Sequence, residues 1–273
     1  MPDMVGTTAF IAFGLMVAAG LILPTVLCIW WLKTRHEKFT SVLTGAMTFL
    51  IFALVLESTV HSIVFLVFPG LRDNVVAYML YGALMAGIFE ETGRFLAYKL
   101  VLKKRTNRET AISYGIGHGG FEAMYILAAT GINNFIYAGI INAGQFPALL
   151  DQLKAAGQDT SSIENLPEQM AAFGIADVGL PVLERVFAVI FHIALSILVF
   201  YAVKKGKIWM YFLAIALHAL LDAPAVLYQK GIISIPVVEV YLAVVGIVTF
   251  VIMYVFLYKR DKEVGEGVQV HNG

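Results

Sequence analysis

The sequence predicts an all-α polytopic membrane protein, a bundle of about seven transmembrane helices. Of its 273 residues, 59% are hydrophobic and 14% are charged. The mean hydropathy is +0.81, which is too apolar for a water-soluble globular domain. Apolar residues form seven long runs, and a helix needs roughly 20 such residues to cross a bilayer. The runs are continuous, whereas strands of a membrane barrel alternate in polarity over about 10 residues.

Each run is expected to form one transmembrane helix. The apolar stretches are uninterrupted, so every backbone N–H and C=O within the lipid can be satisfied inside its own helix. In chain order the seven runs are 7–32, 41–68, 74–102, 111–129 or beyond, 181–203, 208–227 and 235–258.

Basic residues follow alternate runs, which predicts the orientation of the bundle. They gather at 33–38, 99–108, 204–207 and 259–262. By the positive-inside rule, this pattern places the N-terminus outside and the C-terminus in the cytoplasm. The acidic connection 145–180 is then an extracytoplasmic loop that either caps the outer face or moves freely. We expect residues 1–273 to form a single transmembrane domain with a motif-bearing helical core at 74–227.

Charge and cysteine content exclude two classes of function. The formal net charge is +0 and the charges are dispersed, which argues against a nucleic-acid partner. Cys28 is the only cysteine in the sequence, so an intrachain disulfide and a multi-cysteine metal site are both excluded. The expected localisation is integral to the membrane, in a bacterial plasma membrane, and the sequence sets no oligomeric state.

Four ionisable residues lie at the same predicted depth on four different helices. Glu91, His118, His192 and His218 are each 10 to 12 residues from a cytoplasmic basic residue. At 1.5 Å per residue this is about 15 to 18 Å, close to the middle of the bilayer. An isolated charge there costs about 2.5 kcal/mol or more, so we expect these residues to meet inside the bundle.

The stretch FEETGRFLAY supplies three of the charges in the third run. Glu90 and Arg94 are four residues apart and share a helix face, while Glu90 and Glu91 point about 100° apart. We therefore expect one glutamate to be held by the arginine while the other faces the centre of the bundle.

Two further pairs combine a histidine and an acid at a spacing of four residues. They are His118 with Glu122 in GIGHGGFEAMY, and His218 with Asp222 in HALLDAP. A carboxylate on one ring nitrogen fixes the imidazole tautomer and raises its basicity, which suits a general base or a metal ligand. His192 has no such partner within its own turn and is interpreted as a packing or hydrogen-bonding residue.

The glycines of the fourth run have two interpretations. Gly115 and Gly119 form a GxxxG spacing that lets another helix approach closely, and this packing interpretation is favoured. Alternatively, Gly117, Gly119 and Gly120 loosen the helix so that its N–H groups stabilise an oxyanion.

Polar residues near the outer helix ends are interpreted as structural. There, water or a neighbouring charge satisfies them at low cost. These residues are Glu57 and His61, Glu184 and Arg185, and Glu239.

The order of the motifs resembles the intramembrane protease superfamily that includes CAAX-processing, bacteriocin-processing and PrsW-like proteases. A helix with EExxR, a helix with HGGFE, a helix with a histidine and a helix with HxxxD follow one another between Phe89 and Pro224. Within the superfamily the chain is most similar to the YhfC family of intramembrane peptidases. The resemblance implies seven catalytic residues: Glu90, Glu91, Arg94, His118, Glu122, His218 and Asp222.

The chain also departs from part of that superfamily. CAAX-type enzymes carry EExxxR, and asparagine where Asp222 stands, so a prenylated substrate is not implied. The superfamily includes a scaffolding member, the Aph subunit of gamma-secretase, so proteolysis does not follow from the fold alone.

The leading hypothesis is hydrolysis of a peptide bond within or near the membrane. A glutamate assisted by a histidine would activate water, acting on a membrane protein or peptide substrate in the lipid bilayer. No cofactor is favoured. A zinc-dependent variant stays open, with His118, His192 and His218 as the nitrogen ligands. The alternatives are a proton- or ion-coupled membrane transporter and a non-catalytic membrane scaffold.

Overall fold

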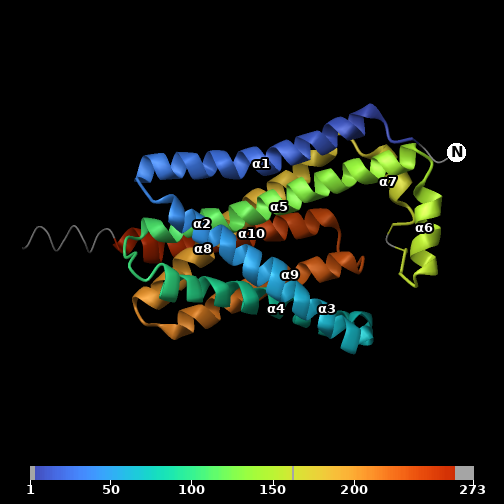
Figure 1. Ribbon diagram of the computed structural model, residues 1–273. Helices are drawn as coiled ribbons and strands as arrows, with labels where there is room; N and C mark the ends of the chain where they lie inside the picture. The colour runs from blue at the N-terminus through green and yellow to red at the C-terminus, as the bar shows by residue number, and fades with distance from the viewer. Residues whose placement is uncertain (1–3, 162, 262–273) are drawn as a thin grey trace, which may run out of the picture. The chain divides into compact units, whose positions relative to one another are not determined.

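The computed structural model describes residues 4–161 and 163–261, and helices form nearly all of this part of the chain (Figure 1). No strand occurs within it. The elements are α1 (Thr7–Arg35), α2 (Phe39–Phe49), η1 (Leu50–Glu57), α3 (Ser58–Val67), η2 (Pro69–Asp73), α4 (Val75–Leu96), η3 (Ala97–Val101), α5 (Glu109–Asn142), α6 (Phe146–Ala155), α7 (Leu166–Ala172), η4 (Ile175–Val178), α8 (Gly179–Lys204), α9 (Ile208–Gln229), α10 (Ile235–Met253) and η5 (Tyr254–Lys259).

Every predicted span coincides with a helix, which confirms the fold class. In the described residues, six helices are long and apolar enough to cross a membrane. The remaining predicted span, the third in chain order, is α4, a helix of 22 residues that carries Glu90, Glu91 and Arg94. These charges explain why α4 falls outside the six. Figure 1 draws α2, η1 and α3 as one continuous rod, which matches the single predicted run 41–68. The orientation of the two termini stays a prediction.

The chain divides into two compact units. One contains the described residues up to Pro24 together with Ala123–Leu183, and the other contains Thr25–Glu122 and the described residues from Glu184 onward. The single-domain assignment of residues 1–273 stays a prediction.

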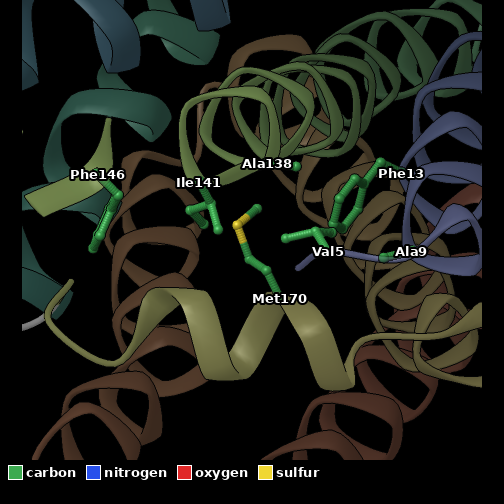
Figure 2. Close-up of a cluster of buried hydrophobic side chains, with 7 residues drawn as sticks. All are labelled: Val5, Ala9, Phe13, Ala138, Ile141, Phe146 and Met170. Carbon is green, nitrogen blue, oxygen red and sulfur yellow. The ribbon is translucent and has the colours of Figure 1, made fainter. Parts of the chain in front are cut away.

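The first unit contains short helices in the connection 145–180, for which the sequence allowed either a cap on the outer face or a mobile loop. α6, α7 and η4 lie within 145–180. Met170 of α7 is buried in one cluster with Ile141 and Ala138 of α5 and Phe13 of α1 (Figure 2). Burying a side chain of this size away from water contributes about 1.5 to 3 kcal/mol. The connection is therefore packed against the unit's own core, and its side of the membrane stays a prediction.

The second unit holds the predicted motifs, and glycines bring its helices close together. A Cβ at Gly87 of α4 would lie 2.7 Å from the backbone oxygen of Ile215 in α9. A Cβ at Gly115 of α5 would lie 2.6 Å from Cα of Ile193 in α8, and Gly119 faces α8 one turn later. Such close backbone approach is the usual reason for small residues in membrane helices. The packing interpretation of the GxxxG spacing is therefore confirmed.

Candidate active site

The charged residues of α4 are buried in the interior of the second unit. Glu91 and Arg94 have no exposed surface, and Glu90 retains 7%. Ionised groups within a membrane persist when they are paired with one another. The partners of these three side chains therefore define the site, and they come from α5, α8 and α9.

Arg94 forms a two-point ion pair with Glu91. Its Nη1 lies 2.5 Å from Oε1 and 2.6 Å from Oε2 of the carboxylate. Nδ1 of His218 is 2.8 Å from the same Oε1. The sequence placed Arg94 on the face of Glu90, but the arginine pairs with the glutamate three residues away. One glutamate is thus held by the arginine, as expected, and it is Glu91.

Glu90 is the glutamate that faces the histidines. Its Oε2 lies 2.7 Å from Nε2 of His118 and 3.9 Å from Nδ1 of His192. Nε2 of His218 is also 3.9 Å from this oxygen. The ring centroids of His118 and His192 are 4.9 Å apart, and those of His192 and His218 are 5.5 Å apart. One carboxylate oxygen therefore lies among three imidazoles from three different helices.

His192 is engaged on both ring nitrogens. Nη2 of Arg94 lies 3.1 Å from its Nδ1. Arginine can only donate, so Nδ1 accepts and the proton of the neutral ring is on Nε2. Nε2 lies 2.5 Å from Oε2 of Glu122. The hydrogen-bonding interpretation of His192 therefore fits, but the residue belongs to the polar cluster and is not a remote packing residue.

The expected pairing of His118 with Glu122 is replaced by pairings between helices. His118 binds Glu90, and Glu122 contacts His192 and Arg185. The helical spacing does place His118 and Glu122 on one face, but neighbouring helices supply closer partners for both.

Arg185 is a site residue that sequence reasoning missed. Its Nη1 donates a hydrogen bond to Oε1 of Glu122 at 2.6 Å, and its Nη2 pairs with Glu184. Its position near the outer end of its helix favours a structural interpretation. A signal was available, because Arg185 is seven residues before His192 and two helical turns return a side chain to the same face.

The predicted pair of His218 and Asp222 is present, with Nε2 3.4 Å from Oδ2. Asp222 differs from the other site acids in its exposure. Its side chain is 36% exposed, compared with 0% for Glu91, 9% for Glu90 and 12% for Glu122. Asp222 therefore lies where the buried cluster meets open space.

The cluster holds more acids than arginines. Three buried carboxylates, those of Glu90, Glu91 and Glu122, accompany the two guanidiniums of Arg94 and Arg185, and the more exposed Asp222 and Glu184 add two further acids. A buried excess of negative charge is costly, so protons on the imidazoles or carboxyl groups must balance it. Groups that exchange protons at hydrogen-bond distance can carry out general acid and base chemistry.

A metal ion has a candidate donor set among these residues. Glu90, His192 and His218 each offer one ligand atom, and these atoms lie within 4.8 Å of one another. Two imidazoles and one carboxylate form the donor set of open catalytic zinc sites. The predicted set contained His118, which binds Glu90 directly in this structure. The nitrogen of His192 that faces Glu90 accepts a hydrogen bond from Arg94, so a metal there would replace that contact.

Comparisons with known proteins agree on one family. A family model described as YhfC intramembrane metalloprotease matches residues 19–242, a range that includes every site residue described above. The protein of Bacillus subtilis (strain 168) named "Uncharacterized membrane protein YhfC" is 35% identical over 247 residues. These cover 89% of this chain and 94% of that protein. No solved structure matches the chain.

Proposed function

This chain belongs to the YhfC intramembrane metalloprotease family, and on that premise we propose that it hydrolyses a peptide bond within or at the edge of the membrane. The substrate is a membrane protein or a membrane-bound peptide, and the setting is the plasma membrane of a bacterium. The observation that supports this function most is the position of Glu90. A carboxylate in contact with one imidazole, and close to two more, is suited to accept a proton from water.

The proposed reaction uses groups that already lie together. Glu90 accepts a proton from a water molecule, and His118 at 2.7 Å fixes the direction of its carboxylate. The water oxygen attacks the carbonyl carbon of the peptide bond, and the carbonyl oxygen becomes an oxyanion. Protonated imidazole and the Arg94 guanidinium stabilise the negative charge.

Collapse of that intermediate completes the hydrolysis. The oxyanion re-forms the carbonyl, the C–N bond breaks, and the proton taken up by Glu90 goes to the leaving nitrogen. The products are a new carboxyl terminus that contains one oxygen from water and a new amine. Glu91 accepts no proton in this scheme, because Arg94 and His218 hold both of its oxygens. Its role is to orient the Arg94 and His218 side chains.

Zinc is compatible with the donor types at the site. Glu90, His192 and His218 would hold the ion, and when bound it would supply a Lewis acid that lowers the pKa of a water molecule. We favour the metal-free glutamate mechanism, because Arg94 already donates to the nitrogen of His192 that a metal would need.

The test is a survey of cleavage that requires no known substrate. The purified protein is reconstituted into the same liposomes as detergent-solubilised membrane proteins from a Bacillus subtilis strain that lacks the relative 35% identical to this chain. New N-termini are then quantified by mass spectrometry. We expect a set of new termini with the wild-type protein that is absent with Glu90→Gln and present with Glu109→Gln, a substitution in the first turn of α5. Identical termini from wild-type protein and Glu90→Gln would refute the proposal.

A further inference from the structure

A second polar cluster lies next to the proposed active site. Nδ1 of His61 is 2.8 Å from the hydroxyl of Tyr81, and Nε2 is 3.1 Å from Oε1 of Glu57. Glu57 ends η1, His61 is on α3 and Tyr81 is on α4. The pairing of Glu57 with His61 fits the structural interpretation, but the mechanism above uses none of these three residues.

Two residues of this cluster line a pocket that reaches the active site. The pocket has a volume of about 200 Å³ and lies between α3, α4 and α9. His61 and Tyr81 line it together with Asp222 and Gln229. Asp222 also contacts His218 at 3.4 Å. The pocket therefore opens directly onto the residue where the buried cluster is most exposed.

One face of α9 runs from the pocket to the active site. The pocket is lined on this helix by Gln229, Ala225 and Asp222. His218 of the active site is four residues N-terminal to Asp222. Spacings of four, three and four residues keep side chains on one helix face. From Gln229 to His218 this face is about 16 Å long at 1.5 Å per residue. An extended polypeptide covers that length with about five residues.

Two exposed cations flank the far end of the pocket. The guanidinium of Arg72 lies 4.0 Å from the ring centroid of Phe65, and Nζ of Lys230 lies 5.8 Å from that of Tyr78. Phe65 and Tyr78 are pocket residues. Neither cation forms a salt bridge with another residue in the described ranges. Other basic residues are rare in the connections that the sequence predicts to be extracytoplasmic, and Arg72 and Lys230 place two cations beside this end of the pocket.

We propose that this pocket is the entrance through which substrate reaches Glu90. The segment that it admits is an extended polypeptide that carries an anionic group, which is either an acidic side chain or a terminal carboxylate. This group lies between Arg72 and Lys230. The distance along α9 places that group about five residues from the cleaved bond. This proposal rests on the proposed peptidase function and deepens it by assigning a substrate class and a route.

Thiol labelling tests the route without requiring hydrolysis. Cys28 is the only cysteine, so Cys28→Ala provides a background for single cysteines at Ala225 in the pocket and at Val248, a 51% exposed position on the apolar helix α10. A membrane-impermeant anionic methanethiosulfonate should label Ala225→Cys from the side of Arg72 and should leave Val248→Cys unlabelled. Absence of labelling at Ala225→Cys would overturn the route.

Gly82→Cys is a second probe of the route, in case Ala225→Cys does not assemble. A Cβ at Gly82 would meet only Val226 Cγ2, at the ordinary contact distance of 3.9 Å. Labelling of this variant supports the route, and its protection overturns it. Because neither variant needs hydrolysis for its readout, failure of the entrance and failure of the peptidase function are seen in separate experiments.

The charge of the mouth is tested with reagents of opposite sign at Gln229→Cys. The labelling rate of each reagent is normalised to the rate at which the same reagent reacts with a free thiol in solution. At low salt, the normalised rate of the anionic reagent should be about tenfold higher than that of the cationic one. Arg72→Gln combined with Lys230→Gln should remove this preference, as should 0.5 M salt, at which the Debye length is only about 4 Å. Equal normalised rates in the unsubstituted mouth would overturn the anionic assignment.

Discussion

Replacing Arg94 by glutamine is expected to destabilise the protein more than any exposed charge substitution. The guanidinium and the Glu91 carboxylate are both fully buried, with two contacts of 2.5 and 2.6 Å between them. The same guanidinium donates to His192 at 3.1 Å. Arg94→Gln therefore leaves a buried carboxylate without its arginine.

The expected loss of unfolding free energy is about 3 to 5 kcal/mol, because a buried charge without its partner is strongly unfavourable. Adding Glu91→Gln should recover much of this loss, because two neutral amides can bond to each other and no charge is stranded. In a double-mutant cycle, the coupling between the two positions should reach about 2 to 3 kcal/mol. Lys154→Gln is the matched control, since its pair with Glu164 is 53% and 46% exposed, and it should leave the unfolding midpoint unchanged.

The assay is reversible unfolding in mixed micelles, with increasing fractions of a denaturing detergent and circular dichroism as the readout. Two results would refute the reasoning. One is a loss below about 1 kcal/mol in Arg94→Gln, because a buried pair cannot be broken so cheaply. The other is a double variant no more stable than Arg94→Gln, which would mean that the stranded carboxylate is not the cause.

Three further predictions follow from packing, from the contacts of Glu122 and from the choice of mechanism. Gly117→Ala should lower the free energy of unfolding by about 1 to 3 kcal/mol in the same assay, because the new Cβ would collide with the Val42 carbonyl. Gly139→Ala is the control, since a Cβ there meets nothing within 4 Å, and it should leave the free energy of unfolding unchanged. Equal effects of the two substitutions would contradict the packing. Arg185→Gln should slow cleavage about 10- to 100-fold, because Glu122 loses its 2.6 Å contact and holds His192 less firmly. An unchanged cleavage rate in a folded variant would show that this contact does not affect activity. Removal of divalent metals with a chelator should leave the cleavage rate unchanged, and one equivalent of zinc together with a chelator-sensitive rate would contradict the glutamate mechanism.

The spans and the convergence of the site could be predicted because both depend on position along a helix. Length and polarity define a span whatever its neighbours are. Counting from the basic ends placed His118 and His218 at the depth of Glu91, and the structure joins His118 to Glu90 at 2.7 Å and His218 to Glu91 at 2.8 Å. Depth is set by the 1.5 Å rise per residue, which requires no knowledge of packing.

The individual pairings could not be predicted, because they depend on the rotation of each helix about its axis. Spacing within one helix suggested His118 with Glu122, but packing turns these two residues toward α4 and α8 respectively. Arg185 was missed for the same reason, since its partner is on another helix. Close contacts at Gly87 and Gly115 set the helix rotations, and single-helix spacing does not report them.

The helices in the connection 145–180 were also not predicted. α6 and α7 each have proline in their first two positions, at Pro147 and Pro167. Proline fits the first turn of a helix, because the first N–H groups have no partner inside the helix. At 10 and 7 residues, these helices are too short to show a clear apolar period. Tertiary contacts such as those of Met170 hold them in place.

The most direct test of the central claim is cleavage of one identified substrate in ¹⁸O-labelled water by purified wild-type protein and Glu90→Gln. The proposal predicts one labelled oxygen in the new carboxyl terminus and a rate at least about 100-fold lower in the variant, the usual minimum contribution of a general base. The two proteins should have the same unfolding midpoint within about 1 kcal/mol, so that the loss reflects chemistry. Equal cleavage rates, or a product without labelled oxygen, would contradict the claim that Glu90 activates water for peptide-bond hydrolysis.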